Sequence, residues 1–135
     1  MSESGAAGLT WGIKYTFLKY VARMPDGKVE LSDGASKTPG GEFFFPLLSE
    51  EGGVSKFGGS VVFTAHHGAM TFAVRNLLIQ GDLLSVDGVP LATIEWGEPG
   101  VSQRVKLTAE GSKLFNTAYP EGELLDAVKV ARASA

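Results

Sequence analysis

Two apolar runs meet at a pair of histidines in Ser60-Val61-Val62-Phe63-Thr64-Ala65-His66-His67-Gly68-Ala69-Met70-Thr71-Phe72-Ala73-Val74-Arg75. In the first run, Val61, Phe63 and Ala65 alternate with Val62, Thr64 and His66, which predicts a β-strand with two different faces. In the second run, apolar residues again occupy alternate positions. Because the loop between the runs is short and contains glycine, the stretch predicts a β-hairpin that carries the chain's two histidines at its end.

Turn-forming residues divide the rest of the chain into similar short runs. There are 18 glycines and six prolines in 135 residues, a spacing typical of all-β sandwiches and barrels. We expect strands over residues 28–31, 42–45, 55–65, 69–79, 83–86, 91–96, 103–108 and 124–130.

Two segments follow a helical pattern instead. Residues 10–22 are predicted to form a helix with Thr10 as its N-cap, because apolar residues recur at helical spacing at Ile13, Phe17, Tyr20, Val21 and Met24. A second, shorter helix is predicted over residues 109–116, although Gly111 weakens its helical propensity. The predicted fold is therefore mostly β, an antiparallel β-sandwich or barrel-like sheet with one N-terminal helix and one short C-terminal helix.

Composition excludes several classes of function. The net charge of −3, without a dense run of Lys or Arg, argues against nucleic acid as a partner, and the absence of cysteine excludes disulfides and thiolate metal sites. No run approaches the roughly 18 apolar residues of a membrane-spanning helix, and the N-terminus does not resemble a signal peptide. We expect no membrane insertion and a cytoplasmic location, or an extracellular or cell-surface one if a leader has been removed. The expected organisation is a flexible segment (1–8), one domain (9–130) and a tail (131–135).

The histidine pair is the first candidate for a functional site, because histidine is the commonest metal ligand. Zinc would need Asp or Glu ligands, and neither His66 nor His67 has one close in sequence. The predicted first helix offers a better partner, since it carries four aromatic residues, among them Phe17 and Tyr20. On these residues alone, the alternative stays open that Tyr20 is a hydrogen-bonded core tyrosine and His66 an ordinary histidine at a hairpin end.

Several motifs of the chain resemble the HtaA domain, the haem-binding module of actinobacterial haem-uptake proteins. Residues 9–21, Leu-Thr-Trp-Gly-Ile-Lys-Tyr-Thr-Phe-Leu-Lys-Tyr-Val, resemble the family's opening pattern Trp-Gly-x-Lys-x-x-Phe-Arg-x-Tyr-Val. Residues 57–70, Phe-Gly-Gly-Ser-Val-Val-Phe-Thr-Ala-His-His-Gly-Ala-Met, resemble Phe-x-Gly-Ser-Val-x-Phe-Thr-Gly-His-x-Gly-x-Leu. Asp-Gly-Ala at 33–35, Phe-Phe-Phe-Pro at 43–46 and the segments at 107–111 and 119–122 extend the resemblance from Leu9 to Val130.

The resemblance implies a specific haem site. A tyrosine of the N-terminal helix would ligate ferric haem iron, and the motif histidine would hydrogen-bond its phenolic oxygen; these roles fall on Tyr20 and His66, with Tyr20 as the metal ligand. His67 occupies a variable position of the motif and is a further candidate for contact with haem. The apolar walls of the site would come from Phe17, Val21, Val62 and Met70.

Three positions depart from the family pattern. Leu18 replaces an arginine, Ala65 replaces a glycine and Met70 replaces a leucine. The missing arginine leaves the haem propionates to other cations, and the candidates are Lys14, Lys19 and Arg75.

The function that the resemblance implies is the binding of ferric haem b for haem transport, buffering or delivery, without enzymatic activity. The expected partners are haem and other haem-handling proteins, with a homo-oligomer left open. One alternative is an HtaA-like fold without haem that acts as an interaction or small-molecule-binding module. Another is a peroxidase-like or haem-degrading enzyme, for which the sequence shows no acid/base pair beyond His67.

Overall fold

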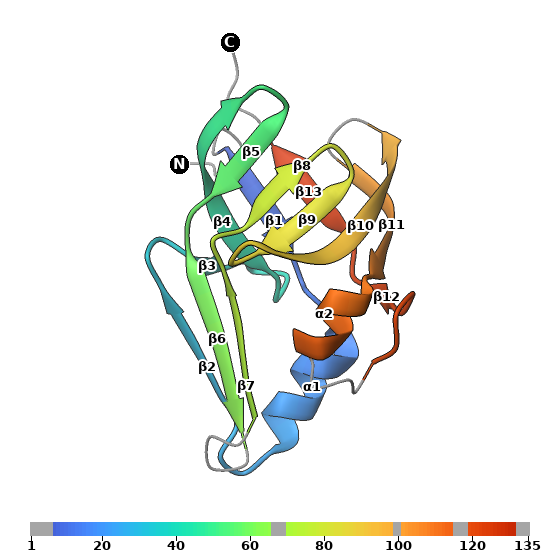
Figure 1. Cartoon of the computed structure of the whole chain (residues 1–135). Coiled ribbons are helices and arrows are strands. Elements are labelled where there is room, and N and C mark those ends of the chain that lie inside the picture. The colour runs from blue at the N-terminus through green and yellow to red at the C-terminus, as the bar shows by residue number, and fades with distance from the viewer. Residues whose placement is uncertain (1–6, 66–69, 99–100, 115–118, 132–135) are drawn as a thin grey trace.

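The computed structural model describes residues 7–65, 70–98, 101–114 and 119–131, and Figure 1 shows their arrangement. Within these residues the chain forms mainly antiparallel strands with two short helices, which confirms the predicted fold class. The helices are α1 (Tyr15–Arg23) and α2 (Ala109–Leu114). The strands are β1 (Gly8–Trp11), β2 (Lys28–Ser32), β3 (Ser36–Lys37), β4 (Phe43–Glu51), β5 (Val54–Phe57), β6 (Ser60–Ala65), β7 (Met70–Arg75), β8 (Leu78–Gln80), β9 (Leu83–Val86), β10 (Val89–Glu98), β11 (Val101–Leu107), β12 (Leu124–Leu125) and β13 (Val128–Ala131).

Eight of the described strands close into a barrel. Their order around the ring is β1-β13-β11-β10-β9-β8-β5-β4, and the ring closes because β1 pairs with both β13 and β4. The two-residue strands lie beside it, β3 on β4 and β12 on β11. Closure matters because a strand in a closed barrel has no exposed edge.

The predicted hairpin forms a separate three-stranded sheet, with β6 between β2 and β7, that extends away from the barrel (Figure 1). Its register pairs Ala65 with Met70, and both histidines fall in the predicted loop between them, residues 66–69, which lie outside the described residues. The predicted alternation is confirmed within β6, where Val61, Phe63 and Ala65 are buried and the residues between them are half-buried. The structure describes β6 only as far as Ala65, so His66 and its face lie outside the described residues.

A single apolar core joins the barrel to the three-stranded sheet. The ring of Phe43 on β4 meets the ring of Phe63 on β6 edge to face, with centroids 5.8 Å apart. Helix α1 lies against the three-stranded sheet, and α2 lies between α1 and the barrel (Figure 1). Gly111 allows α2 to approach β10, since a Cβ at this position would collide with the Leu91 carbonyl oxygen. The glycine that weakens the helix in sequence terms is therefore needed for its packing.

The predicted N-terminal helix was wrong in its first turn. Residues 8–11 form β1, inside the barrel wall, and α1 begins only at Tyr15. Between them Ile13 takes a left-handed backbone conformation with φ of 63°, which is uncommon for a β-branched residue and costs about 1–3 kcal/mol. The N-cap position is Lys14 rather than Thr10, and no side chain caps it. The helical spacing of Ile13 was misleading because Ile13 is buried ahead of the helix rather than on it.

Three predicted strands are in fact pairs of strands. Residues 55–65 divide into β5 and β6 at Gly58 and Gly59, and Gly59 has a φ of 97° and lies against Ala35. Residues 69–79 divide into β7 and β8 at Asn76, where φ is 52°, and residues 124–130 divide into β12 and β13. Each break lets the chain pass from one sheet or edge to another, which a continuous apolar run does not reveal. The short strand β3 was not predicted. The second helix was predicted to extend to residue 116, but α2 ends at Leu114.

A polar cluster holds the junction between the two sheets. Arg75 and Asn76 both donate hydrogen bonds to the Asp87 carboxylate, with Arg75 Nε 2.9 Å from Oδ2. Partial burial raises the pKa of Asp87, but these hydrogen bonds and the Arg75 charge outweigh it, so the pKa lies below its ordinary value of 3.8. The cluster ties the end of β7 to the turn between β9 and β10.

The two helices of the described residues are α1 and α2, and neither is long and apolar enough to cross a membrane.

Candidate functional site

Helix α1 presents Tyr20 at the surface, whereas Phe17 and Val21 of the same helix are buried. Phe17 and Val21 face the core, with Phe17 only 5% exposed, whereas the side chain of Tyr20 is 41% exposed. Residues three or four apart are neighbours on a helix surface, so Tyr20 lies one turn beyond Phe17 towards the end of α1. The sequence-based alternative of a core tyrosine is therefore wrong for Tyr20.

Phe17 fixes α1 against the hairpin. Its ring meets Phe63 of β6 and Phe72 of β7 edge to face, at centroid distances of 5.2 and 5.6 Å. The rings of Phe63 and Phe72, opposite each other in the sheet, are stacked at 6.1 Å. The edge-to-face pairs are favourable because the positive edge of one ring meets the negative face of the other. The structure thus brings the predicted site residue Phe17 against both strands that lead to the histidine loop.

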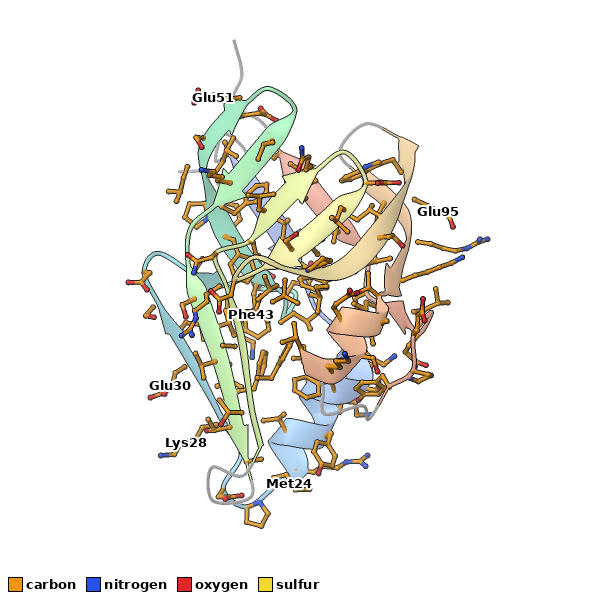
Figure 2. The ribbon with its side chains drawn as sticks, viewed as in Figure 1. Met24, Lys28, Glu30, Phe43, Glu51 and Glu95 are labelled. Atoms are coloured by element: carbon orange, nitrogen blue, oxygen red, sulfur yellow. The ribbon has the colours of Figure 1, made fainter. Side chains whose placement is uncertain are left out.

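The end of α1 lies at the same end of the molecule as the hairpin loop. Helix α1 ends at Arg23, and β2 begins five residues later at Lys28, which pairs with Thr64 near the end of β6. Figure 2 shows Met24 at this end, beside the place where β6 and β7 stop. His66 follows Ala65 directly in the chain, so the segment after Tyr20 and the segment before His66 meet here.

Several predicted site residues lie outside what the structure describes. His66 and His67 fall within residues 66–69, outside the described residues, and Met70 is described as the first residue of β7 but not in its side chain. Val62 was predicted to be one of the apolar walls of the site, together with Phe17. The residue of β6 that contacts Phe17 is Phe63, and Val62, its neighbour in the strand, points to the opposite face.

The three candidate cations for an acidic ligand have different environments. Lys14 is engaged elsewhere, since its Nζ donates to the Leu124 carbonyl oxygen at 3.0 Å and lies 3.1 Å from the Glu123 carboxylate. Arg75 is bound to Asp87 and pairs with Ser60, at the other end of β7 from the loop. Lys19 is exposed and next to Tyr20 in α1, with its Nζ 5.3 Å from the centre of the Tyr15 ring. Of the three, Lys19 has the position that suits a ligand at Tyr20.

Two further residues around Tyr20 were missed in the sequence. Arg23 lies one turn after Tyr20 and is exposed, and Met24, four residues after Tyr20, is half-buried. The signal was present, since positions i+3 and i+4 from a ligand candidate share its helix face. Arg23 was overlooked because the predicted helix ended at residue 22.

A closed metal site is not formed by the described part of the chain. Among these residues no three His, Asp or Glu side chains come together in a way that could hold a metal ion. Instead, the Tyr20 phenol has two exposed cations near it, Lys19 and Arg23. The apolar Phe17 cluster lies one turn away along α1.

Comparisons with known proteins agree with this architecture. The HtaA family model, described as "Htaa", matches residues 6–131. Three crystal structures from Corynebacterium glutamicum share the fold. The haem-binding protein HtaB has a TM-score of 0.78 at 23% identity, covering 93% of this chain and 91% of that one. The N-terminal domain of HtaA has a TM-score of 0.74 at 21% identity, covering 97% of this chain and 99% of that one. The C-terminal domain of HtaA has a TM-score of 0.72 at 20% identity, covering 93% of this chain and 94% of that one. No curated protein sequence matches the chain. Since the family model spans nearly the whole sequence, the chain belongs to the HtaA family.

Proposed function

We propose that this protein binds ferric haem b, with the Tyr20 phenolate as iron ligand and His66 as the hydrogen-bond partner of the phenolic oxygen. The observation that carries the proposal is the exposure of Tyr20 on α1, one turn beyond the Phe17 cluster and at the end of the molecule where the histidine loop begins. HtaB, which shares the fold, is a haem-binding protein.

The surroundings of Tyr20 suit the two halves of a haem molecule. On one side of Tyr20 lie the apolar side chains of Phe17 and of Met24, the residue that follows the end of α1. On the other side α1 carries Lys19 and Arg23, both exposed. A porphyrin has an apolar ring and two carboxylates, so it needs an apolar contact and a cationic contact at the same place. We propose that Lys19 and Arg23 neutralise the propionates, in place of the family arginine that Leu18 replaces.

The roles of the two site residues follow from their chemistry. A neutral phenol is a poor iron ligand, and a hydrogen bond to the phenolic oxygen favours its anionic form. Ferric iron, when haem is bound, supplies the Lewis acid that an anionic oxygen prefers over ferrous iron. Tyr20 would therefore hold the oxidised state, and His66 would keep the phenolate oriented. This chemistry suits haem transport, buffering or delivery, and we propose that function rather than catalysis.

Titration with hemin tests the ligand assignment. The wild-type protein should shift the Soret band and show the resonance Raman bands of a high-spin ferric tyrosinate. Tyr20→Phe should lose the tyrosinate bands, and His66→Ala should keep them in weakened or broadened form. Tyr15→Phe is the matched control, because Tyr15 lies on the same helix, is 62% exposed and faces away from Tyr20. Tyrosinate bands that persist in Tyr20→Phe would refute the assignment.

A second set of measurements separates carriage from the other functions. A carrier should pass hemin to apomyoglobin, and its hemin complex should oxidise a dye with peroxide no faster than free hemin does. A rate far above that of free hemin would favour a haem enzyme. The absence of hemin uptake would favour an interaction or small-molecule-binding module.

A further inference from the structure

The start of α1 is tied to a distant part of the chain. We define the C-terminal strap as residues 119–126, which run beside the segment 11–14. Trp11 Nε1 donates to the Asp126 carbonyl oxygen at 2.8 Å, and the Asp126 amide donates to the Ile13 carbonyl oxygen at 2.9 Å. These two hydrogen bonds hold Ile13 in its left-handed conformation at the point where the chain leaves the barrel and enters α1.

Lys14 makes the third tie, through three groups of the C-terminal strap. Its Nζ donates to the Leu124 carbonyl oxygen, lies 3.1 Å from Glu123 Oε2 and is 5.2 Å from the centre of the Tyr119 ring. The side chain is only 13% exposed. An ammonium group has three protons to donate, and here an anion, a carbonyl oxygen and an aromatic face meet it in one place. Three different groups of the C-terminal strap therefore meet the Lys14 ammonium group.

The C-terminal strap is itself fixed to the barrel. The Leu107 amide donates to the Glu123 carbonyl oxygen at 2.9 Å, and the Gly122 amide donates to the Leu107 carbonyl oxygen at 2.8 Å. Strand β12, inside the strap, pairs with β11 through Leu125 opposite Val105. Lys14, the residue before α1, is therefore connected through the strap to β11 of the barrel.

The geometry points to Lys14 as a positioning residue for Tyr20. Helix α1 has nine residues and no side-chain N-cap, so its direction depends on its attachment at Lys14 and on the Phe17 contacts. Tyr20 lies six residues from Lys14, about 9 Å along the helix axis at 1.5 Å per residue. A swing of about 10° at Lys14 would move Tyr20 by roughly 1.6 Å, which exceeds the tolerance of a hydrogen bond. The part of this inference that concerns haem rests on the proposed function.

Hydrogen exchange of the haem-free protein tests the attachment without any ligand. Lys14→Met keeps the aliphatic stem but removes the charge, and the α1 amides should then exchange about tenfold faster while amides of β10 and β11 keep their protection. Lys14→Arg keeps a cation and should restore much of that protection. Lys56→Met is the matched control, since Lys56 is an exposed lysine on β5, whose neighbours in the barrel are β4 and β8. Unchanged exchange of α1 in Lys14→Met would overturn the inference.

Hemin titration of the same variants tests the positioning of Tyr20. Lys14→Met should bind hemin about tenfold more weakly, with a mixture of tyrosinate and other ligation in the resonance Raman spectrum, and Lys56→Met should match the wild type. Lys14→Met could instead weaken hemin binding only at low salt and leave the hydrogen exchange of α1 unchanged. In that case Lys14 acts through its charge on the ligand, and the inference is wrong. If Tyr20→Phe keeps the tyrosinate bands, the proposed ligand is wrong, but the exchange measurement still decides the role of Lys14.

Discussion

Replacement of Phe17 by alanine should cost this protein a large part of its stability. The side chain is almost completely buried and contacts two further rings, at 5.2 and 5.6 Å. Truncation of a buried phenylalanine costs about 3–5 kcal/mol, which includes the lost transfer free energy and the cavity left behind. Alanine returns roughly 0.5 kcal/mol through its higher helix propensity. We therefore expect the free energy of unfolding to fall by about 2.5–4.5 kcal/mol for Phe17→Ala.

Urea unfolding followed by tryptophan fluorescence measures this change. The buried Trp11 and half-buried Trp96 both lie in the barrel, so the signal reports the loss of the whole fold. Phe17→Leu keeps most of the volume and should cost under about 1.5 kcal/mol. Tyr15→Ala, at an exposed position of the same helix, should stay within about 0.5 kcal/mol of the wild type. A loss below about 1 kcal/mol for Phe17→Ala would refute the packing of α1 on the hairpin.

Three further predictions concern the barrel. Because the folded-state pKa of Asp87 is lowered, its carboxylate adds to the free energy of unfolding. This contribution is complete above the ordinary pKa of 3.8 and is lost as the pH falls through the folded-state pKa. In Asp87→Asn the loss of stability on acidification should be smaller by less than about 1 kcal/mol, because the ion pair is partly exposed. Urea midpoints measured between pH 2 and 6 test this. Gly111→Ala should lower stability in thermal unfolding by about 1–3 kcal/mol, because the added Cβ meets a carbonyl oxygen of β10. Gly40→Ala is the control: a Cβ there has no atom closer than 3.8 Å and should cost under about 1 kcal/mol. Equal effects of the two substitutions would contradict the close approach of α2 to β10. Ser102→Ala should cost about 1–3 kcal/mol, since its hydroxyl accepts a buried hydrogen bond from a β13 amide at 2.8 Å. A neutral result in urea unfolding would show that this amide has another partner.

The local pattern of the hairpin was enough to predict its structure. Strict alternation from Val61 to Ala65 identifies the buried face of β6, and the short glycine-containing loop identifies its partner β7. Both signals depend only on residues close in sequence, because side chains of a strand point alternately to its two faces. The aromatic content of the first helix likewise identified Phe17 and Tyr20 as residues of interest, although it did not show that one is buried and the other exposed.

The boundaries that failed are those set by distant partners. Residues 8–11 form a strand because β4 and β13 lie on either side of them, and β13 is more than a hundred residues away in sequence. The left-handed turn at Ile13 has no sequence signal, since glycine or asparagine is the usual residue there. Lys14 was a candidate for binding an acidic ligand, and only the fold shows that Glu123, Leu124 and Tyr119 surround it.

The sequence by itself determined the strand content, the hairpin with its histidine loop, the helix that carries Tyr20, and membership of the HtaA family. These properties follow from residue type, short-range periodicity and motif, which act within a few residues of chain. Only the tertiary structure decided how the barrel closes and which face of α1 is buried. It also decided that Lys14 serves the C-terminal strap, whereas Lys19 and Arg23 lie beside Tyr20. Contacts between segments separated by a hundred residues depend on the whole packing arrangement, and no local pattern of residues records them.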